Sequence, residues 1–277
     1  MIMESELRQL QLKCLEILDI VVKILNENDI KYSLCGGTAV GAHLYKGFLP
    51  WDDDIDIMMT RENYNKFVKI APHSLPKGYV FADYHTSKFP EKYGFSFGKV
   101  INESTTLIEK PHVIWGVFID ITVYDRIPVS PLRHIDFFLY KLSMSIHQGK
   151  MPGKSLKNRF RSLLLDTIFS NKKRYLLFFQ WVVESLGRTK HYTYRELFGA
   201  YYFVNMKPYR PSVFENYDSI EFEGKRYMIV RDYIEYLQTR YDRTDFREPE
   251  ENQHPIHYSY LNFNLPYKEY IKQHHLE

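Results

Sequence analysis

Four aspartates stand within five positions in the stretch WDDDIDIMM, which runs from Trp51 to Met59. Apolar residues alternate with other residues through its second half, and on a β-strand alternate side chains point to the same face. The alternation therefore predicts a strand over residues 52–59 with its isoleucines in the core. The expected faces are Asp52, Asp54 and Asp56 on one side, and Asp53, Ile55 and Ile57 on the other.

Negative charges this close repel one another, and burial increases the repulsion. A fold tolerates such a cluster when a cation lies among the carboxylates, and oxygen ligands suit Mg²⁺ or Mn²⁺ better than zinc. The other interpretation is a solvated acidic turn. The tight apolar alternation and a Gly-Gly pair 15 residues upstream favour the metal site.

Two further motifs complete a candidate site. Gly36, Gly37 and Thr38 stand where a helix is expected to begin, and glycines there let a phosphate approach the backbone N–H groups. Asp120 stands in the middle of the apolar alternation GVFIDITVYD, where a lone aspartate costs stability unless it serves a site. With Asp54 and Asp56, these motifs predict a phosphoryl-transfer site around one or two metal ions.

The order of patterns along the chain predicts an α+β fold. Helices are expected at 5–28, from Thr38 as N-cap, from Thr60 as N-cap, across much of 131–204, and at 231–241. Strands are expected at 30–35, 52–59, 78–85, 93–101, 105–109 and 116–125, with a hairpin at 219–230. This pattern divides the chain into a catalytic core, 1–128, and a mainly helical part, 129–277, that ends in the hairpin and helix and packs on the core.

Composition limits the classes of function. The 277 residues are 44% hydrophobic with a net charge of +3, which favours a folded protein and argues against a dedicated nucleic-acid binder. We expect a cytoplasmic protein, because its two cysteines stand in apolar segments. We also expect no export signal, because the N-terminus is charged, and no membrane span, because no long apolar run occurs. The segment 141–174 carries nine Lys or Arg and one acid, so it is either a solvated face or a surface that rests on anionic lipid.

The stretch GGTAVGAHLYKGFLPWDDDIDI closely resembles the signature of the LicD family, relatives of the fukutin-type transferases with a nucleotidyltransferase (polymerase-beta-like) fold. The resemblance extends to FGKVINESTTLIE, GVFIDITVYDRIP and FEGKRYMIVRDYIEYLQTRY, and so spans most of the chain. It implies metal binding by Asp54 and Asp56, with Asp52 and Asp120 as further ligands. Gly36, Gly37 and Thr38 match the phosphate-side turn, and Lys46 and Trp51 also match. Leu44 stands where the family often has an arginine.

The resemblance implies a metal-dependent transfer of phosphocholine. The expected donor is CDP-choline or another CDP-alcohol, and the expected acceptor is a sugar hydroxyl of a precursor, plausibly lipid-linked, of a surface polymer such as lipopolysaccharide or teichoic acid. Asp54 and Asp56 would hold the metal, and Asp120 would complete the site and take the acceptor's proton. Lys99 would contact a phosphate or be a solvated lysine, and tyrosines with Trp115 would form the choline cage.

Several alternatives remain at this point. His254 is either near the site or on the surface. The same carboxylates would also serve a nucleotidyltransferase that uses an NTP on RNA or protein. A non-catalytic choline- or metal-binding protein of the same fold is the third possibility, although three repelling carboxylates argue against it.

Overall fold

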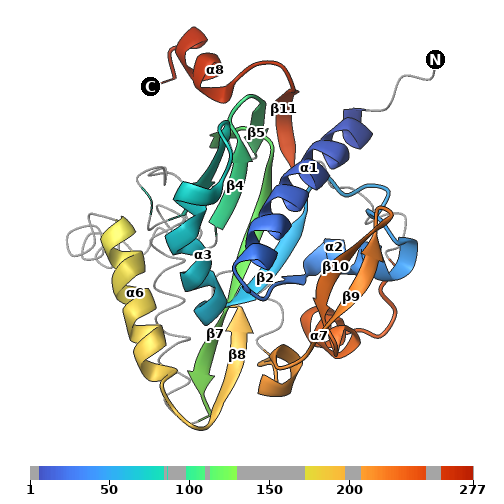
Figure 1. The fold of residues 1–277 in the computed structure, drawn as a ribbon, viewed down its shortest axis with the longest axis vertical. Helices are drawn as coiled ribbons and strands as arrows, with labels where there is room; N and C mark the ends of the chain where they lie inside the picture. The colour runs from blue at the N-terminus through green and yellow to red at the C-terminus, as the bar shows by residue number, and fades with distance from the viewer. Residues whose placement is uncertain are drawn as a thin grey trace, which may run out of the picture.

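One mixed sheet of six strands lies at the centre of the computed structural model, which describes residues 6–83, 86, 98–109, 113–129, 172–196, 207–247 and 257–276. The strands lie in the order β1, β2, β7, β4 and β3, and β8 also pairs with β7 (Figure 1). β2 and β7 are parallel, and the other neighbours are antiparallel. The strands span Ser33–Leu34 (β1), Asp56–Thr60 (β2), Tyr79–Ala82 (β3), Gly98–Asn102 (β4), Phe118–Pro128 (β7) and Tyr192–Glu196 (β8).

Four helices, α1, α2, α3 and α6, contact this sheet. α1 buries Leu10, Cys14, Leu18, Val21 and Leu25, whose three- and four-residue spacing places them on one face, and it contacts β4 and β7. Figure 1 shows α3 beside α1 in front of the sheet. No helix among the described residues is long and apolar enough to cross a bilayer. The helices span Glu6–Glu27 (α1), Gly36–Tyr45 (α2), Arg61–Ser74 (α3), Lys172–Leu186 (α6), Tyr233–Tyr241 (α7) and Tyr267–Gln273 (α8).

The smaller sheets use strands far apart in the sequence. β5, Thr106–Glu109, pairs with β6, Val113–Trp115, and with β11, Tyr258–Asn262. The hairpin of β9, Tyr217–Phe222, and β10, Lys225–Val230, forms as expected, and both residues of its turn, Glu223 and Gly224, have positive φ angles. The 3₁₀-helix η2, Pro211–Phe214, precedes that hairpin.

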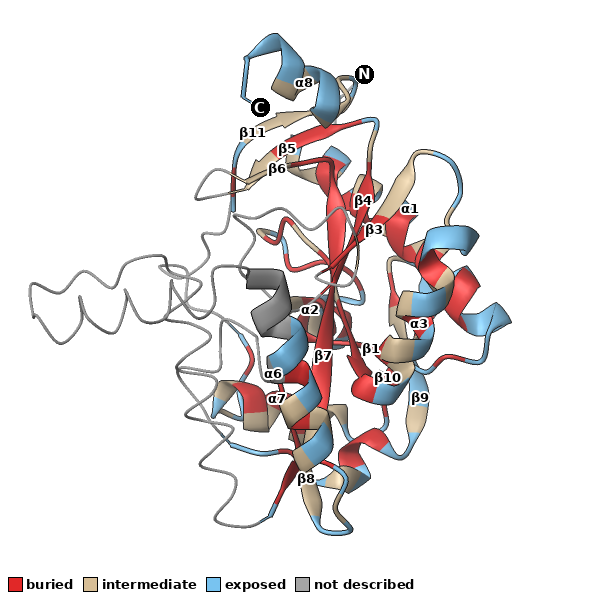
Figure 2. Cartoon of the chain, turned by 90° about the vertical axis from the view of Figure 1, so that its left-hand side faces the viewer, coloured by how far each residue is buried: buried red, intermediate tan, exposed pale blue. Residues whose placement is uncertain are grey.

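Burial is greatest along the centre of the main sheet (Figure 2). β7 is buried along almost its whole length, while α8 has no buried residue. A strand covered on both sides is a rigid support for the side chains it carries. β7 carries Asp120 near its beginning and Asp125 near its end.

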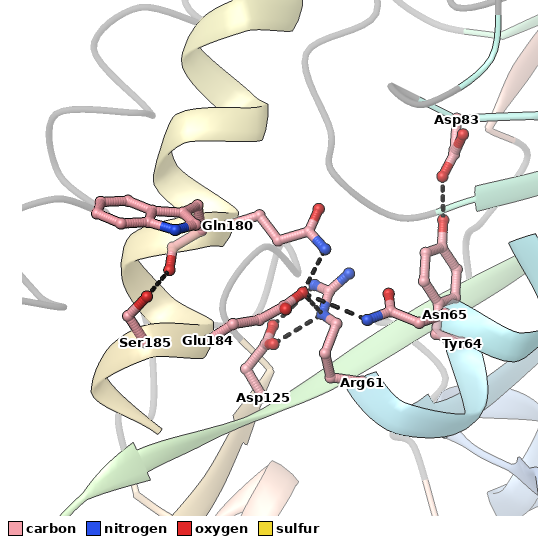
Figure 3. Close-up of polar contacts among 9 residues, drawn as sticks. Arg61, Tyr64, Asn65, Asp83, Asp125, Gln180, Glu184 and Ser185 are labelled. Carbon is pink, nitrogen blue, oxygen red and sulfur yellow. Dashed lines mark hydrogen bonds and ion pairs between the residues drawn. The ribbon is translucent and has the colours of Figure 1, made fainter. Parts of the chain in front are cut away.

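The later part of β7 is fixed to α3 by a buried ion pair. Arg61 donates from Nε and Nη2 to the two carboxylate oxygens of Asp125, at 2.8 and 2.9 Å. Glu184 on α6 accepts hydrogen bonds from Gln180 and Asn65 beside this pair (Figure 3). The pair lines a pocket of about 200 Å³. Asp125 follows Asp120 by five residues, so the ion pair of Arg61 and Asp125 lies about 16 Å further along β7 than Asp120.

The structure confirms a mixed α+β fold and corrects three local predictions. β2 begins only at Asp56, so residues 52–54 form a loop and the strand alternation does not apply to them. α2 begins at Gly36, with Cys35 as its N-cap, rather than at Thr38. β8 lies inside the span predicted to be helical, 131–204, of which residues 172–196 are described. The strands β6 and β11 were not predicted from the sequence.

Other expectations are met or remain open. Thr60 precedes α3 as expected, but its hydroxyl accepts a hydrogen bond from the Asn63 side chain and makes no cap bond to the helix backbone. The division of the chain near residue 128 stays a prediction. Among the residues after it, β8 joins the main sheet and β11 pairs with β5.

Candidate active site

Three neighbouring strands bring three charged residues to one level of the main sheet. Asp56 on β2 is paired in register with Asp120 on β7, and Asp120 is paired in turn with Lys99 on β4. Side chains paired in register on adjacent strands lie on the same face. The sheet therefore carries two carboxylates and an ammonium group in one row.

The loop before β2 adds further carboxylates. Asp52 and Asp53 are buried and Asp54 is half-buried. The loop is tied to the core because Gln11 Nε2 donates to the Asp52 carbonyl at 2.9 Å. The Asp120 N–H donates to the Ile55 carbonyl, also at 2.9 Å, which joins the end of the loop to β7.

The two glycines at the start of α2 lie directly against these carboxylates. A Cβ atom on Gly36 would be 2.7 Å from Asp56 Oδ2, and one on Gly37 would be 2.6 Å from Asp52 Oδ2. Gly36 also has a φ of +55°, which favours glycine. The Gly-Gly pair therefore lets the first turn of α2 approach two acidic side chains, a close contact that was not predicted from the sequence.

Burial and mutual repulsion oppose the ionised form of the cluster. Burial, followed by the charge of Asp120, raises the pKa of Asp54 to about 7. Burial and Asp54 raise the pKa of Asp56 to about 7, and burial also raises that of Asp120 to about 7 although Lys99 lowers it. The pKa of Asp52 is raised well above its ordinary value by burial and by Asp54. A cation among these oxygen atoms would offset this repulsion, so the donor set fits a hard divalent metal.

Lys99 is fully buried and has acidic partners. Its Nζ is 2.7 Å from Asp120 Oδ1 and 3.5 Å from Glu109 Oε1, and it lies 3.4 Å from the centre of the Phe118 ring. Burial lowers the pKa of Lys99, but Asp120 and Glu109 outweigh it and the net shift is upward. The alternative of a solvated lysine is therefore wrong, and its contact with a phosphate stays a prediction.

His257, just before β11, was not identified from the sequence. Its backbone N–H donates to Asp53 Oδ2 at 2.6 Å, and its Nδ1 lies 2.7 Å from Asp53 Oδ1. The hydrogen bond to Asp53 raises the pKa of His257 to about 9. Within the described ranges, Asp53, Asp54 and His257 form one group whose possible metal-ligand atoms all lie within 4.8 Å of one another. His254, which was expected either near the site or on the surface, lies outside the described residues.

The remaining predicted residues have different surroundings. The Thr38 hydroxyl accepts the Asp56 N–H at 2.9 Å, which links α2 to β2. Lys46 lies at the other end of α2, where its Nζ is 3.4 Å from Glu221 Oε2. Trp115 is buried and donates from Nε1 to Glu109 at 3.1 Å. The phosphate role of Lys46 and the choline role of Trp115 stay predictions.

Two comparisons with known proteins found related sequences. A family model described as "LicD/FKTN/FKRP, nucleotidyltransferase domain" matches residues 29–126. The lipopolysaccharide cholinephosphotransferase LicD of Haemophilus influenzae is 30% identical over 261 residues, which cover 91% of this chain and 96% of that protein. An uncharacterized protein of Rickettsia typhi is 39% identical over 57 residues, covering 21% of this chain and 18% of that protein.

Proposed function

The chain belongs to the LicD family, and from this premise we propose that it transfers phosphocholine from CDP-choline to a sugar hydroxyl of a surface-polysaccharide precursor. The observation that carries the proposal is the register of β2 and β7, which pairs Asp56 with Asp120 beside the loop that holds Asp54. All three carboxyl groups have a pKa raised to about 7. We also assign the fold to the polymerase-beta-like nucleotidyltransferases, with support from the description of the matching family model.

Four aspartates would hold the metal of this enzyme. Asp52, Asp54, Asp56 and Asp120 supply carboxylate oxygens, which suit Mg²⁺ or Mn²⁺. When bound, the cation would neutralise charge on the donor's diphosphate and on the departing CMP. The close approach of Gly36 and Gly37 to two of these carboxylates supports a compact site.

The chain's own residues would position the reactants and move one proton. In the first turn of α2, the backbone N–H groups of Gly37 and Thr38 would face the donor's phosphates, while the Gly36 N–H is donated to the Tyr236 hydroxyl. The acceptor oxygen would attack the phosphorus that carries choline, its proton would pass to Asp120, and the bond from that phosphorus to the CMP oxygen would break. Lys99 Nζ donates to Asp120 Oδ1 at 2.7 Å and would hold this base in place.

Product analysis tests this function. The protein is incubated with Mg²⁺, an acceptor glycan and a panel of CDP-alcohols, and separately with NTPs. We expect CMP release from CDP-choline in the wild type and none in Asp56→Asn, which should keep its circular-dichroism spectrum. Pyrophosphate release from an NTP would favour a nucleotidyltransferase, and metal binding without turnover on any CDP-alcohol would favour a non-catalytic binding protein.

We further propose a cytoplasmic enzyme that works at the inner face of the membrane on a lipid-linked acceptor. The proposal is supported by two cysteines, Cys14 and Cys35, that are free and buried, and by the basic composition of 141–174, most of which lies outside the described residues. Co-sedimentation with anionic liposomes at low and high salt tests the contact. No binding at low salt would exclude it.

A further inference from the structure

A buried polar network runs from α7 to the first residue of α2. Arg240 donates from Nη1 to Glu196 on β8, and also to the Tyr124 hydroxyl on β7 at 3.2 Å. The Tyr124 hydroxyl lies 3.0 Å from Glu196 Oε2 and 3.2 Å from the Tyr236 hydroxyl. The Tyr236 oxygen in turn accepts the Gly36 N–H at 3.3 Å. All four side chains are buried, so the network is shielded from water.

The end of this network coincides with the carboxylate site. The first N–H groups of a helix have no partner within the helix, and Tyr236 satisfies the one on Gly36. The same glycine lies against the Asp56 carboxylate, because a Cβ at this position would be 2.7 Å from Asp56 Oδ2. The Tyr236 hydroxyl therefore holds the backbone of Gly36, the residue that lies against the Asp56 carboxylate.

The structure also explains why a tyrosine hydroxyl can hold this position firmly. The Tyr236 ring is fully buried and stacks on Tyr209, with ring centres 5.5 Å apart and planes at 28°. Its hydroxyl is held on one side by Tyr124, which is itself bound to Glu196 and Arg240. A group with locked orientation and satisfied hydrogen bonds is what a precise site needs behind the residues that touch the ligand.

We infer that Tyr236 is a positioning residue for the transfer reaction: through Gly36 it holds the first turn of α2 against Asp56. This inference rests on the proposed function. Tyr236 acts through Gly36 and Asp56, so its loss should loosen the metal and donor side of the site. The acceptor side should be unaffected.

The test compares two tyrosine-to-phenylalanine variants. Tyr236→Phe removes the hydroxyl and keeps the stacked ring. Tyr227→Phe is the matched control, because it removes another buried tyrosine's hydroxyl, which donates to Asp19 on α1 at 2.7 Å. Mn²⁺ affinity is measured by electron paramagnetic resonance, and kcat and the two KM values by CMP release.

We expect Tyr236→Phe to bind Mn²⁺ about tenfold more weakly and to turn over about tenfold more slowly, with an unchanged KM for the acceptor. Tyr227→Phe should match the wild type in all three. Equal Mn²⁺ affinity and kcat in the two variants would overturn the inference while leaving the proposed function intact. A wild type that neither binds Mn²⁺ nor releases CMP would overturn the proposed function instead.

A second variant covers the case in which Tyr236→Phe does not fold. Tyr124→Phe removes the hydroxyl that joins Tyr236 to Glu196. We expect a loss of Mn²⁺ affinity and kcat in the same direction, and a smaller one, because the contact between Tyr236 and Gly36 remains. A lowered melting temperature with unchanged Mn²⁺ affinity would mean that the network is only structural, and would overturn the inference.

Discussion

The substitution Asp56→Asn should make the metal-free protein more stable while it abolishes transfer. In the folded protein burial and Asp54 raise the pKa of Asp56 from 3.8 to about 7. Folding is therefore penalised once the unfolded chain has lost this proton, and the penalty grows from about pH 4 until it is complete above about pH 7. About three pH units at about 1.4 kcal/mol each give a penalty of about 4 kcal/mol, an upper figure because neighbouring carboxylates share the same repulsion.

Urea unfolding with a chelator present measures this penalty. We expect Asp56→Asn to exceed the wild type in free energy of unfolding by about 2–4 kcal/mol at pH 8, and by less than half of that at pH 5. The raised pKa of His257 stabilises the fold at low pH, and this effect is lost as the pH rises to about 9. Both proteins keep His257, so this effect cancels in their comparison. Asp218→Asn, which removes an exposed carboxylate on β9, is the control and should change stability little.

Adding Mg²⁺ or Mn²⁺ at pH 8 should reverse the order. The proposed cation would bind the folded wild type and not the unfolded chain, so it should raise the wild-type midpoint more than that of Asp56→Asn. A variant that is less stable than the wild type at pH 8 in chelator would refute the reasoning. In that case the Asp56 carboxylate would be a stabilising partner in the metal-free fold, and its charge would need another explanation.

Three further substitutions probe the surroundings of the site. Gly37→Ala would place a Cβ 2.6 Å from Asp52 Oδ2, so the carboxylate must move; we expect a loss of more than tenfold in Mn²⁺ affinity with little change in urea midpoint. Asp125→Ala leaves the buried Arg61 without its bidentate partner and should cost about 3–5 kcal/mol in unfolding free energy, while the donor KM of the folded enzyme stays unchanged. Lys99→Met removes the cation beside the Asp120 carboxylate, so the pKa of Asp120 should rise and the pH–rate profile should move to higher pH. The circular-dichroism spectrum of the variant should still show the fold.

The parts of the site that the sequence predicts well are those fixed by local pattern. Ile55, Ile57 and Ile121 are buried as their alternation requires, and Asp56 and Asp120 occupy the intervening positions on neighbouring strands. The period of a strand acts over a few residues, so it can be read without knowledge of the fold. The same reasoning failed at residues 52–54, because there the chain is a loop and has no fixed period.

What escaped the sequence depends on contacts between distant segments. His257 meets Asp53 across 204 positions, and Gly36 meets Tyr236 across 200. β8 lies in the span 131–204, which was predicted to be helical from its local pattern. Its strand state depends on pairing with β7, which is far away in the sequence. No local pattern encodes these pairings, so the histidine and the network behind α2 appear only in the folded structure.

The charges around the cluster show how a strongly repelling set of carboxylates could hold the proposed cation. Burial raises the pKa of Asp120 and Asp56, but Lys99 lowers that of Asp120 and Arg240 lowers that of Asp56. Without these cations the carboxyl groups would stay protonated at neutral pH, and a protonated carboxyl group is a poor metal ligand. With a full set of tight ion pairs, they would have little affinity left for a metal. A pKa near 7 lies between these limits, so the proposed divalent cation would displace the remaining protons on binding and would still be released.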